Sequence, residues 1–419
     1  MKEGKKLVPK LRFPEFRNAE RWKLVTLREA SVPVTERVGQ RKLTPVSISA
    51  GIGFVPQAEK FGRDISGNQY QLYTLVRDGD FVFNKGNSLK FPQGCVYLLQ
   101  GWGQVAAPNV FICFRLKDGY SNGFFQNCFE QNQHGNQLKK HITSGARSNG
   151  LLNISKETFF GVEIQTPSPP EQQKIAECLS SVDDLIAAQA RKLDALKTHK
   201  KGLMQQLFPR EGETKPRLRF PEFKDAGDWD VTSIGQLGEV VTGSTPSTAR
   251  PEYYGGDRMF VSPADISDGR FIEKTKTTLT VLGFEETRPI TANSILFVCI
   301  GSTIGKIAQN RHECATNQQI NSVVPNSNNA HGFVYYALSG MADEIANLAG
   351  IQAVPIVNKS LFSSVELLVP KPPEQQRIAD CLTSLDDLIA AQTQKLGALK
   401  THKKGLMQQL FPSVQAVDG

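Results

Sequence analysis

The clearest pattern in the chain is a seven-residue apolar repeat over residues 169–209, and the same pattern returns over 372–412. In each segment the apolar positions form two heptad series offset by four, which is the spacing that keeps one helix face against a partner helix. The seam positions are Ile175, Leu179, Val182, Ile186, Leu193, Leu196, Leu203 and Leu207 in the first segment and Ile378, Leu382, Leu385, Ile389, Leu396, Leu399, Leu406 and Leu410 in the second. We therefore predict two long helices with coiled-coil seams.

The two segments are near copies, since only seven of their 41 aligned positions differ. Both open on Pro-Pro-Glu-Gln-Gln, and these prolines and the glutamate suit a first helical turn. About 38 helical residues would span about 57 Å, so each helix is a candidate spacer. Polar residues interrupt both seams and should fix their register: Gln189 and Lys200 in the first, and Gln392 and Lys403 in the second. An alternative is that each helix packs only on its own domain. We favour pairing, because a lone narrow seam would stay exposed.

A second repeat precedes each globular stretch. The lead-in Leu11-Arg12-Phe13-Pro14-Glu15-Phe16, with Trp22 after it, returns as Leu218-Arg219-Phe220-Pro221-Glu222-Phe223, with Trp229 after it. The chain is therefore two half-chains, and such a duplication predicts pseudo-twofold symmetry. We expect a nearly circular arrangement, in which the N-terminal lead-in lies near the end of the second helix. The predicted parts are a lead-in and first domain at 1–168, a helix at 169–209, a linker at 210–217, a second lead-in and domain at 218–371, a helix at 372–412 and a tail at 413–419.

The globular stretches contain short β-branched and aromatic runs, broken by glycine and asparagine, that predict strands. In the first half these are Phe81–Phe83, Cys95–Leu99 and Val110–Phe114, and in the second Ser294–Ile300 and Ile320–Val324, followed by a helix over Val334–Leu348. Outside the repeats the two stretches are hard to align. We expect an α+β protein with two mixed α/β domains, duplicated in scaffold and divergent in their recognition surfaces.

Composition limits the class of protein. The 419 residues are 39% hydrophobic and 21% charged, with a net charge of +8 and a pI of about 9.0, which allows a polyanionic partner. Seven scattered cysteines are typical of reduced core residues. No apolar run reaches membrane-spanning length, so we expect a cytoplasmic protein.

Residue patterns that would indicate catalysis are missing. The six histidines do not fall at metal-ligand spacing with cysteines or carboxylates. The run Gly301–Ile307 is too short for a phosphate loop and has isoleucine where serine or threonine would hold magnesium. Asp265, Glu273 and Lys274 match no nuclease arrangement. We therefore predict no catalytic residue and no metal site.

Polar loops remain as candidates for contact with DNA, because lysine and arginine seek phosphates while amides and hydroxyls can pair with base edges. For any single residue, an ordinary solvated turn is the competing interpretation. The candidates are Arg41, Lys42, Lys85, Asn87, Ser88, Lys90, Arg147 and Asn149 in the first half, and Ser244, Thr245, Ser247, Arg250, Ser302, Thr303, Lys306, Asn317, Gln318 and Gln319 in the second.

The chain resembles the specificity subunit of type I restriction–modification systems. The paired Pro-Pro-Glu-Gln-Gln helices, the Phe-Pro-Glu-Phe lead-ins and the dissimilar globular stretches carry the resemblance, together with Thr242–Pro246, Gly301–Lys306 and Thr316–Asn321. It implies two target-recognition domains that each read half of a split DNA sequence, with the long helices paired antiparallel between them. It also implies two modification subunits and a translocating restriction subunit as partners. S-adenosylmethionine, ATP and Mg would be bound by those partners and not by this chain.

Two alternatives remain open at this point. The chain could serve another methyltransferase or restriction architecture, or it could be a coiled-coil adaptor that does not bind DNA. A self-sufficient enzyme has less support from the residues. The DNA target and the individual base contacts do not follow from the sequence.

Overall fold

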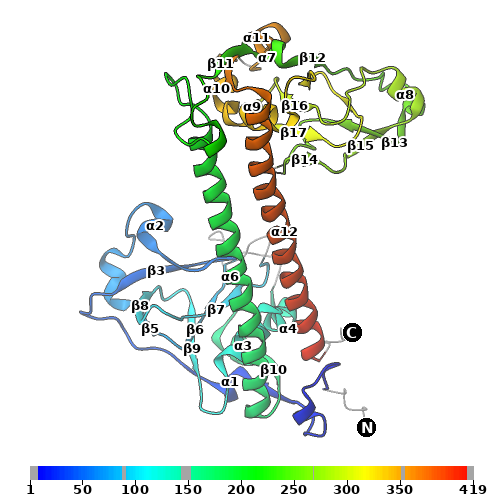
Figure 1. The fold of residues 1–419 in the computed structure, drawn as a ribbon. Helices are drawn as coiled ribbons and strands as arrows, with labels where there is room; N and C mark the ends of the chain where they lie inside the picture. The colour runs from blue at the N-terminus through cyan, green and yellow to red at the C-terminus, as the bar shows by residue number, and fades with distance from the viewer. Residues whose placement is uncertain (1–7, 87–90, 143–151, 268, 351–353, 413–419) are drawn as a thin grey trace. The chain divides into compact units, whose positions relative to one another are not determined.

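The computed structural model describes residues 8–86, 91–142, 152–267, 269–350 and 354–412. The chain divides into two compact units. Unit 1 comprises Met1–Ala188 with Leu396–Gly419, and unit 2 comprises Gln189–Lys395. The two heptad segments form unbroken helices of 39 residues, α6 (Pro169–Leu207) and α12 (Pro372–Leu410) (Figure 1). Each unit thus contains the first half of one long helix and the last half of the other.

Unit 1 is built on two four-stranded sheets, ordered β2-β9-β6-β7 and β4-β3-β8-β5, and on a short pair β1-β10. The strands are β1 (Lys23–Thr26), β2 (Ser31–Pro33), β3 (Thr44–Ser49), β4 (Gly53–Pro56), β5 (Thr74–Arg77), β6 (Asp80–Asn84), β7 (Cys95–Leu98), β8 (Gln104–Ala107), β9 (Ile112–Leu116) and β10 (Glu163–Thr166). The helices besides α6 are η1 (Pro14–Phe16), α1 (Leu27–Ala30), α2 (Gln57–Phe61), η2 (Gly67–Leu72), α3 (Asn122–Glu130), α4 (Gln133–Leu138), η3 (Lys139–His141) and α5 (Lys156–Phe160).

Unit 2 has a five-stranded sheet ordered β12-β19-β16-β17-β14, a three-stranded sheet β15-β13-β18 and a pair β11-β20. The strands are β11 (Asp230–Ser233), β12 (Gly238–Thr242), β13 (Tyr254–Val261), β14 (Phe271–Ile272), β15 (Thr277–Leu279), β16 (Ile295–Val298), β17 (Ile307–Asn310), β18 (Ala315–Thr316), β19 (Ile320–Pro325) and β20 (Glu366–Val369). The helices besides α12 are η4 (Pro221–Phe223), α7 (Ile234–Leu237), η5 (Pro251–Tyr253), α8 (Val281–Glu285), α9 (His331–Gly340), α10 (Ala342–Asn347) and α11 (Lys359–Ser364).

The expected α+β class is confirmed, although several element boundaries differ from the predicted ones. The helix predicted over 334–348 is two helices, because Met341 leaves the helical conformation with φ −98° and ψ 6°. The strand predicted from Val110 begins only at Ile112, since a turn with a hydrogen bond from Phe111 N to Pro108 O precedes it. Apolar runs alone set neither boundary, because hydrophobicity is the same on both sides of such breaks.

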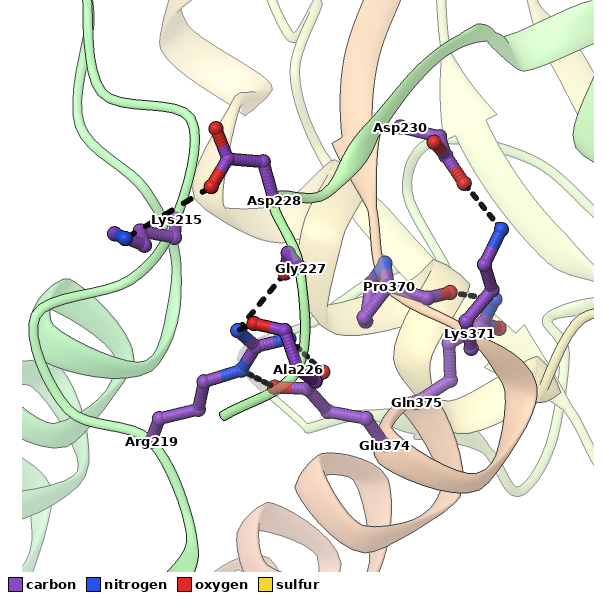
Figure 2. Close-up of polar contacts among 10 residues, drawn as sticks. All are labelled: Lys215, Arg219, Ala226, Gly227, Asp228, Asp230, Pro370, Lys371, Glu374 and Gln375. Atoms are coloured by element: carbon purple, nitrogen blue, oxygen red, sulfur yellow. Dashed lines mark hydrogen bonds and ion pairs between the residues drawn. The ribbon is translucent and has the colours of Figure 1, made fainter. Parts of the chain in front are cut away.

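The Pro-Pro-Glu-Gln-Gln motif joins each long helix to the lead-in and to a shorter helix of the same unit. In unit 2, Arg219 of the lead-in forms a bidentate pair with Glu374 at 2.7 Å and donates to the carbonyls of Ala226 and Gly227 (Figure 2). Gln375 donates to Pro370 O and accepts a hydrogen bond at 3.0 Å from Ala330 N, at the start of α9. Glu374 is 2% exposed, so the pair is charge-assisted and shielded from water.

The same contacts recur in unit 1. Arg12 pairs with Glu171 at 2.6 Å and 2.8 Å, and Gln172 accepts a hydrogen bond from Ser121 N at the start of α3. Trp22 Nε1 also donates to Glu171, at 3.3 Å. The sequence repeat is therefore a repeat of buried polar contacts between the lead-in and its helix.

Apolar side chains at the end of each long helix complete the core of the other half. In unit 1, the Phe411 ring lies 5.4 Å from that of Phe124 and 5.9 Å from that of Trp22. In unit 2, the Phe208 ring lies 5.5 Å from that of Phe333 and 6.1 Å from that of Trp229. Leu11 N donates to Gln409 O in unit 1, as Leu218 N does to Gln206 O in unit 2. The N-terminal lead-in thus contacts the end of the second helix.

The helix seams are the inward faces of α6 and α12. All sixteen apolar seam residues are buried or partly buried. The polar residues of the seams are paired: Gln189 Nε2 donates to Gln392 Oε1 at 2.5 Å. Lys200 pairs with Asp386 in unit 2, and Lys403 pairs with Asp183 in unit 1 at 2.8 Å. In unit 2, Gln189 contacts Gln392 and the later residue Lys200 contacts the earlier residue Asp386. The helix segments there therefore run antiparallel.

All seven cysteines are free, and five of them are buried. Among the described helices, none combines the length and apolar character needed to cross a membrane.

Candidate nucleic-acid interface

Three loops of unit 2 converge beside β19, and they contain most of the second-half candidates. Ser244 N, after β12, donates to Thr316 O at 2.9 Å, and Thr245 Oγ1 donates to Gln318 Oε1 at 2.6 Å. The third loop, the turn after β16, joins them through Gln319 Nε2, which lies 3.4 Å from Ile300 O. The structure therefore brings together Ser244, Thr245, Asn317, Gln318 and Gln319 with the turn that carries Ser302, Thr303 and Lys306.

Asn317 and Gln319 use their amides to hold the loops in place. Asn317 Nδ2 donates to Gln319 Oε1 at 3.0 Å, and Gln319 N donates back to Asn317 Oδ1 at 3.1 Å. Both side chains are partly buried. Gln318 between them is exposed, so in this arrangement it is the member of the motif best placed to reach a base edge.

Two glycines permit the close approach of these loops. A Cβ on Gly243 would lie 2.3 Å from the carbonyl oxygens of Thr316 and Asn317, which no side chain allows. Gly301 has a φ of +93°, in the region that favours glycine, where the turn leaves β16. The turn closes by a hydrogen bond from Lys306 N to Thr303 O, and Lys306 Nζ lies 3.3 Å from Ile266 O with the residue exposed.

Ser247 and Arg250 lie further along the loop after β12. Both are exposed, and Arg250 Nη1 donates to Tyr253 Oη at 2.7 Å. Two residues that sequence reasoning missed hold this loop: Arg288 Nη1 donates to Thr242 O, and Tyr254 Oη donates to Pro246 O. Arg288 adds an exposed cation to the surface. No spacing in the sequence connects it to Thr242, so only the fold could show it.

The described first-half candidates are Arg41, Lys42 and Lys85. Arg41 and Lys42 are exposed and precede β3, and Arg41 pairs with Glu36 at 3.0 Å. Lys85 follows β6, in the other four-stranded sheet, and its carbonyl accepts a hydrogen bond from Leu152 N. The remaining candidates lie outside the described residues: Asn87, Ser88, Lys90, Arg147 and Asn149.

Histidine, cysteine and carboxylate side chains of the described residues form no cluster of three or more that could hold a metal ion. His134, the one buried histidine of the described chain, packs its ring against the edges of Phe83 and Phe129. Burial lowers the pKa of His134 to about 4, so the ring is neutral at pH 7. It has the environment of a core residue.

Comparison with known proteins assigns the family. The type I restriction modification DNA specificity domain matches the chain twice, at residues 68–198 and 226–401. Since these matches cover well over half of the sequence, the chain belongs to this family.

Particular relatives are similar over shorter stretches. The chain is 31% identical over 167 residues to the type I restriction enzyme MjaIX specificity subunit of Methanocaldococcus jannaschii, over 39% of each chain. It is 33% identical over 147 residues to the HindI specificity subunit of Haemophilus influenzae, over 34% of this chain and 32% of that one. These matches span well under two thirds of either relative's length.

The fold is similar over nearly the whole chain to a crystal structure of a type I restriction-modification system S subunit from M. genitalium. The TM-score is 0.61 at 14% identity, and the superposition covers 97% of this chain and 100% of that one. At this identity the likeness describes the fold alone.

Proposed function

We propose that this chain is the DNA-specificity subunit of a type I restriction–modification complex. In this proposal each globular stretch reads one half of a split DNA target, and α6 and α12 set the gap between the halves. The observation that carries it is the exchange of helix ends. Each unit incorporates the last turns of the other half's long helix into its own core, and the proposal takes these contacts as the attachment of each domain to the helix pair.

Physical arguments support these separate roles for the long helices as spacers and for the globular domains as DNA readers. A helix pair of fixed register converts helix length into a distance between half-sites, and domains on a duplex contact sites about one helical turn, or about 34–36 Å, apart. Exposed cations such as Lys42, Lys306 and Arg288 would supply salt-dependent affinity for phosphates. The exposed Gln318 and Thr245 would supply sequence choice.

The duplicated helices also support a pseudo-twofold, nearly circular arrangement that presents matching surfaces to two modification subunits. Exposed residues identical in both copies include Leu185 and its repeat Leu388, which are 57% and 39% exposed although they are apolar. In the proposal these two leucines belong to the matching surfaces that the modification subunits cover. A restriction and translocation subunit would join the same complex in the cytoplasm.

Catalysis belongs to the partners in this proposal. The chain itself would be non-catalytic, while S-adenosylmethionine, ATP and Mg would be bound by the modification and restriction subunits. The chain would therefore determine which DNA is modified without performing the methyl transfer. Incubating the purified chain with DNA and S-adenosylmethionine should give no methylation until a modification subunit is added.

The spacer role has a direct test. Inserting one heptad at matching points of α6 and α12 lengthens both helices by about 10 Å, or about three base pairs, and keeps the seams in register. Sequencing methylated sites in cells should show a gap about three base pairs longer between unchanged half-sites. Replacing residues 23–166 with the equivalent stretch of another specificity subunit should change one half-site only. Altered half-sites with an unchanged gap in the heptad variant would contradict the proposal.

A further inference from the structure

An open groove lies in unit 1, and the matching place in unit 2 is filled by an arginine. The groove has a volume of about 1110 Å³ and lies between β7, α3, the first half of α6 and the last part of α12. Its charged lining consists of four carboxylates and one ammonium group, from Glu130, Glu177, Asp183, Asp184 and Lys403. This excess of negative charge opposes DNA phosphates, so the groove is not part of the nucleic-acid interface.

The helices α3 and α9 occupy matching places in the two units. The start of each donates to the first glutamine of a Pro-Pro-Glu-Gln-Gln motif, as described above. Each also carries a glycine packed on its long helix: a Cβ added to Gly123 would lie 3.0 Å from the Cβ of Ala176, and one added to Gly332 would lie 3.0 Å from the Cβ of Ala379. Counting from these glycines, Asn127 of α3 matches Tyr336 of α9.

In unit 2 the guanidinium of Arg270 fills the space beside α9 and α12. Its Nη1 donates to Tyr336 Oη at 3.0 Å and to Thr383 Oγ1 at 2.6 Å, and its Nε donates to Gln309 Oε1 at 2.8 Å. It also lies 4.9 Å and 5.1 Å from the ring centroids of Tyr336 and Tyr335. Hydrogen bonding and cation–π contact thus hold a planar cation at this place.

Unit 1 keeps two of the three acceptor positions, Asn127 and Ser180, without the arginine among its described residues, while Leu98 stands where unit 2 has Gln309. Arg270 directly precedes β14, the strand that extends the unit 2 sheet beyond β17. The matching sheet of unit 1 ends at β7, whose Leu98 pairs with Phe81 as Gln309 of β17 pairs with Ile295. Leu98 lines the groove.

The surroundings of Gly123 and Gly332 also differ by this one arginine. The Cβ added to Gly332 would lie 3.0 Å from Arg270 Nη2, whereas the one added to Gly123 meets only Ala176 within 4 Å.

A buried acceptor in the groove independently indicates a missing donor. Asn127 lines the groove and is 7% exposed. Its Nδ2 donates to Gly123 O at 2.7 Å, while its Oδ1 is buried and receives no hydrogen bond from the described residues. Buried carbonyl oxygens are rarely left in this state, because their loss of water is not compensated. In unit 2, the matching Tyr336 Oη accepts a hydrogen bond from Arg270.

We propose that the unit 1 groove binds an arginine side chain of a modification subunit, in the position that Arg270 holds in unit 2. The identity of this partner rests on the proposed function above. The guanidinium donates to Asn127 Oδ1 and to Ser180 Oγ, the counterpart of Thr383. Asp184 and Glu177 add charge attraction, while Asp183 stays paired with Lys403 as Asp386 is with Lys200. The two docking faces are therefore unequal, and only unit 1 takes an arginine from outside.

The repeat supplies a matched control for the test. Glu177→Gln with Asp184→Asn removes two exposed carboxylates from the groove, and Asp380→Asn with Asp387→Asn removes their counterparts in unit 2. Binding of the modification subunit to the full chain, measured by titration calorimetry, should weaken about tenfold for the first pair and less than about twofold for the second. Asn127→Leu should weaken it similarly, and unchanged thermal unfolding would show that these variants fold. Equal effects of the two pairs, or none, would overturn the proposal.

A photo-crosslink identifies the occupant. With p-benzoylphenylalanine replacing Gln173, an exposed residue of the groove lining that the proposal does not place against the guanidinium, the crosslinked peptide of the modification subunit should contain an arginine. Changing that arginine to alanine should weaken wild-type binding about tenfold and leave the weakened binding of the groove pair almost unchanged. Crosslinks to a second copy of this chain, or to a segment without arginine, would refute the inference. If the wild-type chain bound no modification subunit at all, the proposed function itself would fail, which is a different result.

Discussion

At the scale of single residues, the candidate interface separates side chains that hold loops from side chains that can reach DNA. The side-chain amides of Asn317 and Gln319 form hydrogen bonds with each other and with the backbone, and both residues are partly buried. Gln318 and Lys306 are exposed. The sequence presents all of these residues alike, as polar residues in turns. Only their exposure in the folded loops distinguishes the two groups, since Gln318 and Lys306 also form hydrogen bonds.

We predict different outcomes for Lys306→Ala and Gln318→Ala. Because Lys306 would contact phosphate, its loss should reduce the slope of log K against log salt by about one and leave the methylated sequence unchanged. Loss of Gln318 should relax base preference at one position, where discrimination falls by about 1–3 kcal/mol. Fluorescence anisotropy at several salt concentrations and sequencing of methylated sites would measure both. A relaxed position in the Lys306 variant would contradict this assignment.

His134 should make unit 1 sensitive to acid. Burial among phenylalanines lowers the pKa of His134 from 6.5 to about 4, so below pH 6.5 the unfolded chain takes up a proton that the folded chain does not. The stability present above pH 6.5 is then lost as pH falls toward 4, by about 3 kcal/mol.

Hydrogen exchange measured between pH 7 and pH 4 should show this loss in unit 1, and His134→Leu should reduce it. Unit 2 is the internal control, because His134 is the one buried histidine among the described residues. The same acid sensitivity in the leucine variant would exclude His134 as its cause.

At the scale of elements, the sequence was most informative about α6 and α12. Heptad spacing predicted both helices and their inward faces, because a period of seven is imposed by helix geometry before any tertiary contact forms. The role of Pro-Pro-Glu-Gln-Gln could not be read from spacing, since Glu171 and Gln172 act on residues of the lead-in and of α3. A Gly-Phe pair in both halves, Gly123-Phe124 and Gly332-Phe333, was the one sequence signal for the match between α3 and α9.

The central glutamine pair should set register at some cost in stability. Replacing Gln189 and Gln392 with leucine removes their hydrogen bond and buries apolar surface. The free energy of unfolding should therefore rise by about 2 kcal/mol, which thermal unfolding would show as a higher Tm. The gap between methylated half-sites should become heterogeneous, as alternative registers are no longer excluded. Leucine at the exposed repeat positions Gln205 and Gln408 is the control and should leave the gap uniform. A single unchanged gap in the Gln189 and Gln392 variant would show that register is fixed elsewhere.

At the scale of the whole molecule, both units are assembled from distant parts of the chain. Unit 1 needs the segment that begins at Leu396, and Leu410 and Phe411 belong to its core. The internal repeat predicted that the N-terminal lead-in lies near the end of the second helix, where Leu11 N donates to Gln409 O. Apolar patterns could not show that Leu410 and Phe411 join the core of unit 1, because seam residues and core residues are equally apolar. Phe208, which directly follows the end of α6, likewise packs on Trp229 of unit 2.

Phe411→Ala should therefore loosen the N-terminal unit. Phe411 is 2% exposed and contacts Trp22 and Phe124, so its truncation should cost unit 1 about 3–5 kcal/mol. Phe208→Ala should act on unit 2 instead, and less strongly, since Phe208 is only partly buried. Hydrogen exchange followed by mass spectrometry would locate the loss of protection. Loss confined to unit 2 in the Phe411 variant would be inconsistent with the observed core.

The contacts of the helix ends also determine the order in which the two units can complete their folding during synthesis. A ribosome releases the first domain early, but Trp22 and Phe124 acquire their packing partner Phe411 only after all of unit 2 has been synthesised. Unit 2 has its complete set of residues once Lys395 has emerged. The N-terminal unit is therefore completed after unit 2, and a truncation before Phe411 would damage the part of the protein that was translated first.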